Sequence, residues 1–480
     1  MTEGQYRKEI INLSKTENFS VADNAFIEKI DSLADSLKKM ILDNSDDITS
    51  SNGTTYYVSS DGNDNFDGKS PETAIATIKK VNELELNEGD AVVFRRGDIF
   101  RGTLMAKCGV SYSAYGTGPK PKIMLSYNGK VGKWVKTKKR HIWKYSEPLD
   151  DIDICLITFN DCEKYAEKKT SLAEVKEDLD FTYNCKWAKN DDHSLYLYCK
   201  KGNPSDVFDS IEISRKGSVI KVLPKYHDIT VKNLELLYGQ DPFFTGKLTK
   251  NIKISYCTMG WSGGDYFSEK FTRYGGGAGC WHSCNGYYFD HCYIYQQFDA
   301  GISPQYNHKP ETNWDPELNV FKDFKATDCL FENIEYTLEY FTTHHHQDKC
   351  GFKNLYFAYN LCRLGGHGFG DKTHRSSYIK SWNHKNTCTD CKIEYNVFDR
   401  AANWDIEIYG HAPGKKGTDV DYSYIPKLSN NIYIEPKEKE FANVNGVKYL
   451  FNEFSYKALA ALEVQKDDVY VFVDAETPLK

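Results

Sequence analysis

The fold of this 480-residue chain is decided by FDHCYIYQQFDAG (residues 289–301) and ATDCLFENIEYTLEYF (residues 326–341). Both segments have the same phase: a cysteine precedes an apolar run, and an acidic residue, Asp299 or Glu339, follows it. Repetition at a spacing of a few tens of residues is typical of a solenoid, in which each repeat forms one coil. Residues at the same phase of successive coils would stack about 4.8 Å apart. We therefore predict that Asp299 and Glu339 lie side by side.

The same phase recurs along the chain after residue 210, and an asparagine or a cysteine marks it in each segment. These residue types at one turn of a solenoid favour an internal ladder, in which side-chain amides hydrogen-bond the next coil or thiols stack in the core. Such a ladder also explains the high number of cysteines, 14, without any chemistry. The predicted ladder positions are Asn233, Cys257, Cys292, Cys329, Asn360 and Asn396.

The rest of the chain differs from this repeat. FIEKIDSLADSLKKMIL, within residues 1–50, places its apolar residues on one stripe and predicts a helical arm, packed on the solenoid or on a partner chain. Residues 51–125 alternate short strands with Gly and Asp turns and would form the cap and first coils. Residues 126–205 are short alternating strands between charged turns, which predicts a small β-sandwich-like domain inserted before the main solenoid at 206–480.

The composition excludes several classes of function. The formal net charge is −7 and Lys and Arg are interspersed, so the sequence shows no basic stripe for nucleic acid. No apolar run approaches the length of a membrane span, and the N-terminus MTEGQYRKEIINLSKTENFS lacks the pattern of a secretion signal. We therefore expect a cytoplasmic protein with reduced thiols and no nucleic-acid or membrane partner. The lone Cys-x-x-Cys at Cys388 and Cys391 is more typical of structural cysteines than of a zinc or redox site.

Acidic residues recur at a similar distance after each ladder position: Asp241, Asp265, Asp299, Glu339, Asp371 and Glu407. A stacked row of carboxylates is electrostatically costly, because like charges about 5 Å apart raise each other's pKa unless a positive charge lies between them. The central pair, Asp299 and Glu339, lies among aromatic residues that would hold one acid protonated near neutral pH. Paired carboxylates of this kind are the catalytic groups of glycosidases.

Several motifs resemble those of a known superfamily. They begin with Tyr-Tyr-Val-Ser, Asp-Gly and Ser-Pro-Glu-Thr-Ala after residue 54 and continue as RYGGGAGCW (273–281), YIYQQFDAGISPQ (293–305), IEYTLEYF (334–341), GFGDKTHRSSYIKSWN (368–383) and YNVFDRA (395–401). In this order they resemble right-handed parallel β-helix carbohydrate-active proteins of the pectate-lyase-like superfamily, in particular glycoside hydrolases of the β-xylosidase type and their bacterial relatives. The resemblance implies an all-β, right-handed parallel β-helix. It also implies that Asp299 and Glu339 are the catalytic acids.

Other residues near these motifs would bind the substrate, an oligo- or polysaccharide. The chain has 8 Trp and 34 Tyr, and flat aromatic rings suit sugar rings. Lys372 and Arg375 would neutralise the acidic row or hold a uronate. The candidate substrate-binding residues are Trp261, Arg273, Trp281, Gln305, Trp314, His367, Asp371, Lys372, Arg375 and Trp404.

No motif supports a metal or another cofactor. The loop DGNDNFDG (61–68) is rich in oxygen ligands, which leaves calcium as an alternative, but it lacks the acidic residue that closes a twelve-residue EF-hand frame. The run His344–His346 offers imidazoles, but adjacent residues of a strand alternate faces, so at most two of the three would face one ion. We therefore predict no metal and no cofactor.

Three functions are compatible with the sequence. The first is a glycoside hydrolase that retains configuration, with Asp299 as nucleophile and Glu339 as acid/base, because stacked carboxylates have the short separation that retention requires. The second is a polysaccharide lyase or epimerase acting on uronates, for which Arg273, Lys372 or Arg375 would supply the base. The third is a carbohydrate-binding or tailspike-like protein without turnover, for which a homo-oligomer is an option.

Overall fold

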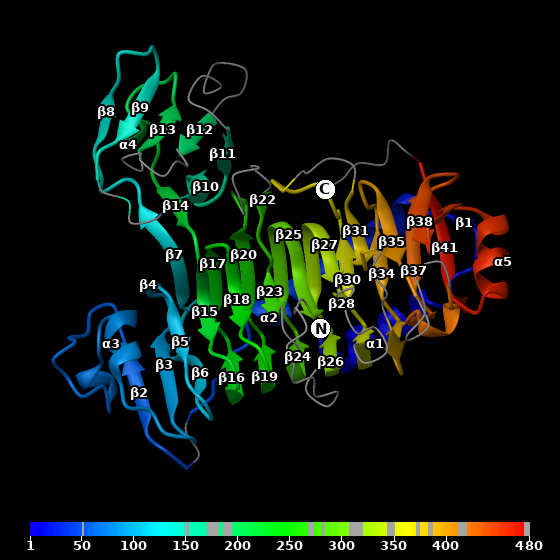
Figure 1. Cartoon of the computed structure of the whole chain (residues 1–480), viewed down its shortest axis with the longest axis horizontal. Helices are drawn as coiled ribbons and strands as arrows, with labels where there is room; N and C mark the ends of the chain where they lie inside the picture. The colour runs from blue at the N-terminus through cyan, green and yellow to red at the C-terminus, as the bar shows by residue number, and fades with distance from the viewer. Residues whose placement is uncertain are drawn as a thin grey trace, which may run out of the picture.

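The computed structural model describes residues 1–49, 52–147, 149, 153–169, 182–185, 194–266, 273–280, 284–306, 320–342, 351–370, 375–382, 387–410 and 420–474. Its strands stack along one long axis as a right-handed parallel β-helix, as predicted, and an inserted domain projects from one side (Figure 1). Each coil contributes strands to three faces, which we number in chain order.

The first face is a separate twelve-stranded sheet of parallel strands. Its inward residues are buried and its outward residues alternate with them, as in β24, where Tyr287 is buried and Tyr288 is half-buried. The strands are β2 (Thr55–Val58), β3 (Ala91–Arg95), β6 (Ser111–Tyr115), β16 (His227–Lys232), β19 (Thr249–Ser255), β24 (Cys284–Asp290), β26 (Val320–Thr327), β29 (Gly351–Ala358), β32 (Cys388–Thr389), β33 (Lys392–Glu394), β36 (Lys427–Ser429) and β40 (Gln465–Lys466).

The second and third faces belong to one 27-stranded sheet, because the long strands β25 (Tyr293–Tyr306) and β27 (Leu330–Glu339) bend from one face to the other. The other strands of the second face are β4 (Ile99–Arg101), β7 (Lys122–Asn128), β17 (Glu235–Tyr238), β20 (Thr258–Ser262), β30 (Leu361–Arg363), β34 (Val397–Asp399), β37 (Ile432–Pro436) and β41 (Val469–Val473). Those of the third face are β5 (Leu104–Ala106), β15 (Ser218–Val222), β18 (Asp241–Thr245), β23 (Ala278–Cys280), β28 (Phe341–Thr342), β31 (Ser377–Lys380), β35 (Trp404–Ile408), β38 (Glu440–Val444) and β39 (Val447–Leu450).

The predicted ladder lies at the turn between the first and second faces. Cys257, Cys292 and Cys329 are buried free thiols in register, and the Cys292 backbone N–H donates to the Cys329 thiol. The ladder then continues with amides, because the Asn360 backbone and side-chain N–H groups both donate to Asn396 Oδ1 at 3.0 Å. A buried amide that bonds the coils on both sides provides hydrogen-bond partners for the backbone groups of the turn and fixes the spacing of the coils.

One predicted rung is wrong and two were missed. The register pairs Lys232 with Ser255, so Leu234 lies opposite Cys257, and Asn233 occupies the preceding turn position with a φ of 60°. At the other end, Asn431 and then Asp468 extend the ladder beyond Asn396. The spacing misplaced Asn233 by one residue because asparagine suits the left-handed turn as well as the rung.

The helical arm packs on the second face of the solenoid. Helix α1 (Glu3–Leu13) begins with a capping box between Thr2 and Gln5, and α2 (Asn24–Leu42) begins at the Asp23 cap. An apolar row projects outward from six successive coils and is covered by these helices: Tyr293, Leu330, Leu361, Val397, Ile432 and Val469. The buried helix residues are Tyr6, Ile10, Leu13, Ile30, Leu33, Ala34, Leu37 and Ile41.

Between the helices, β1 (Ser20–Val21) pairs in parallel with β41 of the last coil. Figure 1 shows the arm, in blue, lying along the C-terminal half of the solenoid. None of the helices in the described residues is both long and apolar enough to cross a bilayer. The remaining short helices are α3 (Ile78–Glu83), α4 (Pro204–Val207), α5 (Glu453–Ala461) and the 3-10 turns η1 (Pro71–Thr73) and η3 (Tyr422–Tyr424).

The chain between β7 and β15 forms a domain with its own apolar core, which includes Trp134, Phe159, Leu197 and Phe208. Antiparallel pairing of β10 and β7 with β14 joins this domain to the solenoid. Its strands are β8 (Trp134–Lys136), β9 (Ile142–Tyr145), β10 (Ile154–Phe159), β11 (Lys164–Lys168), β12 (Thr182–Cys185), β13 (Leu195–Tyr198) and β14 (Ile211–Arg215).

The expectation of reduced thiols throughout is wrong at one position. Cys388 and Cys391 form a disulfide, because the turn after β32 brings their Cα atoms to 5.7 Å. Both cysteines are buried in the core, so the pair is structural, as the spacing alone indicated. Ten other cysteines in the described part of the chain are not in disulfides.

Candidate active site

The third face carries a row of charged side chains on successive coils. The register places Ser303 of β25 beside Glu339 of β27, Glu339 beside Lys380 of β31, and Lys380 beside Glu407 of β35. All four residues are buried. The row is therefore not a stack of acids, because a lysine separates its two carboxylates.

The Glu339 carboxylate is fixed by three donors. Its Oε2 accepts hydrogen bonds from Ser303 Oγ at 2.9 Å and from Gln305 Nε2 at 2.7 Å. Its Oε1 accepts from the Trp382 indole N–H. Hydrogen bonds of this number stabilise the ionised form of a carboxyl group. Glu339 is consequently arranged as a carboxylate, whereas the sequence had suggested a proton donor on account of its aromatic neighbours.

Lys380 supplies the positive charge that a row of acids requires. Its ammonium donates to Glu407 Oε2 and lies 4.2 Å from the centre of the Trp382 ring. Burial lowers the pKa of Lys380 to about 8, against the opposing effect of Glu339. Sequence reasoning missed this lysine, although it stands in the motif YIKSW, because only the strand register reveals that it separates two glutamates.

Asp299 does not stack on Glu339, and that prediction is wrong. The pairing of β25 with β27 shifts between Gln297 and Ala300, where the strand turns the corner between two faces. The residue opposite Glu339 is Ser303, four positions after Asp299. The spacing of residues in the sequence does not reveal the bend at the corner. The short distance between the two carboxyl groups, which was inferred from stacking, therefore no longer follows.

Asp299 and Glu339 nevertheless lie near enough to the same two tyrosines, Tyr336 and Tyr274, to raise the pKa of both. Burial raises the pKa of Tyr336, and the charges of Asp299, Glu335 and Glu339 raise it further. Burial likewise raises the pKa of Tyr274, with Asp299 and Glu339 as the next contributions. Both catalytic candidates therefore lie around one group of aromatic side chains. Glu335, which the sequence analysis did not single out, joins them.

A second acidic cluster borders Asp299. Burial raises the pKa of Asp241 well above its usual range, and the charges of Asp265 and Asp299 add to this effect. Asp241 Oδ1 accepts a hydrogen bond from the Gly276 N–H at 3.0 Å, and Asp265 forms an ion pair with Lys216 at 2.9 Å. Burial and these neighbouring charges therefore favour the neutral form of the Asp241 carboxyl group.

Some of the predicted substrate-binding residues are occupied elsewhere. Trp261 is buried and stacks on Phe369 in the cluster under the inserted domain, so its ring is not an open sugar platform. The Arg273 guanidinium lies 4.0 Å from the Phe298 ring centre and donates through Nε to the Gly264 carbonyl. Trp261 also contacts Tyr165, and Arg273 Nη2 donates to the Cys155 carbonyl, so both residues hold the inserted domain against the solenoid.

The other predicted residues lie closer to the charged row. Gln305 bonds Glu339 directly, and Arg375 lies near enough to Lys380 to lower its pKa. Trp404 pairs in register with Ser377 and donates its indole N–H to Glu440. His367 is exposed after β30. Trp281, Trp314, Asp371, Lys372 and the run His344–His346 lie outside the described residues.

Potential metal ligands gather away from this site. Among the described residues, the group of three within 4.8 Å of one another is Asp290, His291 and Asp328. Arg7 of the arm binds both oxygens of Asp328, at 2.7 and 2.5 Å, so a cation already occupies that carboxylate. In the loop 61–68, Asp64 accepts hydrogen bonds from Ala76 and Thr77 and so stabilises the turn.

Comparison with known proteins leaves the family unassigned. No family model and no curated protein matches the chain. Similar solved structures include a complex of XylC with xylose (TM-score 0.44, 11% identity, 88% of this chain and 83% of that one) and a pectate lyase, Pel9A (0.40, 9%, 90% and 81%). Another is a GH136 lacto-N-biosidase from Eubacterium ramulus (TM-score 0.37, 14% identity, 93% and 70%). By their names these proteins include both a hydrolase and a lyase.

Proposed function

We propose that this protein is a carbohydrate-active enzyme, a glycoside hydrolase acting on an oligo- or polysaccharide. The observation that carries the proposal is the Glu339 carboxylate, which is held by Ser303, Gln305 and Trp382 and shares its tyrosine neighbours with a second carboxyl group, Asp299. Two carboxyl groups with different environments are what glycosidic hydrolysis requires.

The environment of Glu339 indicates its role, and the role of Asp299 follows by exclusion. Glu339 is the ionised partner, because its hydrogen bonds and the nearby Lys380 ammonium stabilise negative charge. Asp299 is then the proton donor to the leaving oxygen, which reverses the roles expected from the sequence. Trp382, whose indole N–H binds Glu339, is half-buried and offers one ring face to a sugar, and the buried Tyr336 packs edge-on against it with the ring centres 6.0 Å apart.

The register also bears on stereochemistry. Retention requires two carboxyl groups about 5 Å apart, whereas inversion leaves room for a water between them. Asp299 is offset from the residue that pairs with Glu339 by four positions along β25. This offset favours inversion, with Glu339 as the base that activates water. Proton NMR of the first product formed tests the assignment, and a product of unchanged anomeric configuration would contradict it.

Substitution at the two carboxyl groups tests the roles. Glu339→Gln should abolish turnover of every substrate, because a glutamine amide cannot act as the base that activates water. Asp299→Asn should lose activity on substrates with poor leaving groups and keep more of it on activated aryl glycosides, since these need no proton donor. Glu453→Gln on the exposed surface of α5 is the matched control and should be fully active. Full activity of Glu339→Gln would overturn the site.

A second candidate function, that of a polysaccharide lyase, is favoured by one residue, Lys380. A polysaccharide lyase abstracts a proton beside a uronate carboxyl group, and a buried lysine with a pKa of about 8 suits that step. Arg375 would then neutralise the uronate. The product distinguishes the two reactions, because elimination leaves an unsaturated sugar that absorbs in the ultraviolet and hydrolysis leaves only a new reducing end.

A further inference from the structure

The outward surface of the first face carries lysines and tyrosines in register. From β19 onward, pairing aligns Lys253 with Tyr288, Tyr288 with Lys325, and Lys325 with Tyr356. The same line continues through Lys392 and Lys427. Coils are spaced by about 4.8 Å, so lysines recur beside aromatic rings along the axis of the solenoid. The sequence concealed this line because each coil contributes only one residue to it.

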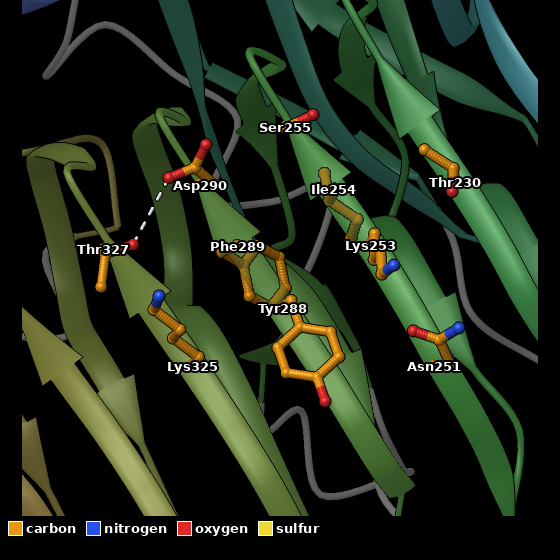
Figure 2. Close-up of a pocket in the computed structure, with 10 residues that line it drawn as sticks. All are labelled: Thr230, Asn251, Lys253, Ile254, Ser255, Tyr288, Phe289, Asp290, Lys325 and Thr327. Carbon is orange, nitrogen blue, oxygen red and sulfur yellow. Dashed lines mark hydrogen bonds between the residues drawn. The ribbon is translucent and has the colours of Figure 1, made fainter. Parts of the chain in front are cut away.

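A groove of about 590 Å³ lies where the line crosses β19, β24 and β26. Figure 2 shows the Tyr288 ring in this groove, with Lys253 and Lys325 on the strands to either side. The ring lies over Gly286, where an added Cβ would come within 3.0 Å of the Tyr288 hydroxyl. Glycine therefore lets the ring lie along the strand with one side toward the solvent. A ring in this position is a platform for a flat ligand.

The face is basic, although the chain carries a formal net charge of −7. Two further lines of outward residues flank the central one and add lysines to it. The acidic side chains of the face are hydrogen-bonded to neighbours: Asp323 accepts from Asn354 at 2.7 Å, and Glu394 accepts from the Tyr356 hydroxyl at 3.0 Å. Asp228 accepts from the Asn251 amide, and Asp290, which lines the groove, accepts from the Thr327 hydroxyl at 3.4 Å. The lysines in outward positions are Lys232, Lys250, Lys253, Lys322, Lys325, Lys353, Lys392, Lys427 and Lys466.

We propose that this face binds an anionic polysaccharide along the axis of the solenoid, at a site separate from the charged row of the third face. Lysine ammonium groups would pair with the carboxylate or sulfate groups of the chain, and Tyr288 and Tyr356 would contact the faces of the intervening sugars. A regular line of equal steps fits a ligand that is itself a regular polymer. Charge complementarity selects an acidic chain over a neutral one.

The composition of the face disfavours nucleic acid as the ligand. Arginine is the residue that recognises phosphates through paired hydrogen bonds, and the described strands of the first face from β16 to β40 contain no arginine. Lysine acts as a point charge and places no demand on the geometry of the acid it meets. The site is built for regularly spaced single charges.

Binding of defined polymers to the full chain tests the proposal. Alginate supplies carboxylates, dextran sulfate supplies sulfates, dextran is the neutral counterpart, and single-stranded oligothymidylate supplies phosphates. Alginate or dextran sulfate should bind and dextran should not, which also identifies the preferred anion. Lys253→Gln/Lys325→Gln should weaken this binding about tenfold, as expected for the loss of two exposed ion pairs. Tyr288→Ala should weaken it without any change in charge.

A matched control removes two exposed lysines from the inserted domain, Lys136→Gln/Lys138→Gln, and should leave binding unchanged. Turnover of small aryl glycosides should be unaffected by the Lys253, Lys325 and Tyr288 substitutions, so failure of this proposal and failure of the proposed hydrolase are distinguishable. Equal weakening by the control pair, tighter binding of oligothymidylate than of either acidic polysaccharide, or no binding of either acidic polysaccharide would overturn the proposal.

Discussion

At the scale of single residues, the charged row depends on Lys380. Its ammonium separates Glu339 from Glu407, and burial holds its pKa near 8, so the row loses its cation when the pH rises above that value. A lysine that deprotonates there leaves two buried carboxylates, one on the coil to either side of it, without a charge between them.

We therefore expect kcat/KM for an aryl glycoside to fall as the pH rises through about 8. Lys380→Arg keeps the charge at all accessible pH values, because a guanidinium does not deprotonate, and should abolish that decline even where it lowers the rate. Lys448→Arg, at an exposed lysine near Trp404, is the control and should keep the wild-type profile. An unchanged alkaline decline in Lys380→Arg would exclude Lys380 as its source.

The last rung of the ladder is an acid with a displaced pKa. Asp468 is buried and accepts hydrogen bonds from Asn431, and burial raises its pKa from 3.8 to about 8. The stability that its neutral form contributes is complete below pH 3.8 and is lost progressively as the pH rises toward 8, because the unfolded chain releases this proton more readily. The loss amounts to about 1.4 kcal/mol for each pH unit in that window.

Asp468→Asn should remove this loss and continue the ladder with another amide. The variant is expected to be more stable than the wild type at pH 7 and equally or less stable at pH 4, measured as the free energy of unfolding in urea. Asp467→Asn, at the exposed neighbouring position with a φ of 55°, is the matched control, because asparagine tolerates that conformation. The same pH dependence in the wild type and in Asp468→Asn would contradict the assignment.

At the scale of elements, helix α2 covers an apolar row on the second face that would otherwise be exposed to solvent. Leu37 is fully buried against the second face, whereas Asp35 points to solvent on the same helix. Leu37→Ala should destabilise the protein by about 2–5 kcal/mol, the usual cost of a buried leucine. Asp35→Ala should change the stability by no more than about 0.5 kcal/mol. Equal effects of the two substitutions in urea unfolding would mean that the helix does not pack as described.

The elements also show which features the sequence could specify. The coils and most rungs were predictable because each coil repeats one local pattern, with Cys292, Cys329 and Asn360 at the same turn. The active-site geometry was not, because it depends on the bend at Asp299, which shifts the register of β25 against β27. Lys380 was overlooked for a related reason, since its importance arises from pairing between coils and not from its neighbours in the chain.

At the scale of the whole molecule, the arm ties both ends of the solenoid together. Strand β1 pairs with β41 of the last coil, where the Phe19 N–H donates to the Tyr470 carbonyl at 2.7 Å. After α2 the chain reaches the first coils, where Asp47 forms an ion pair with Arg96 at 2.7 Å. In a solenoid each coil contacts only its neighbours, so the terminal coils are the least protected unless something covers them.

Removal of residues 1–22 tests this role, because it deletes α1 and β1 and leaves α2 in place. The last coil then loses its parallel neighbour and exposes the edge of β41. Amide hydrogen exchange should become faster in β37 and β41, whereas β3 and β6, which the deleted segment does not touch, should exchange at the wild-type rate and serve as the internal control. Faster exchange throughout the solenoid would mean that the arm stabilises it as one unit, and unchanged exchange in β41 would mean that the last coil is stable without its cover.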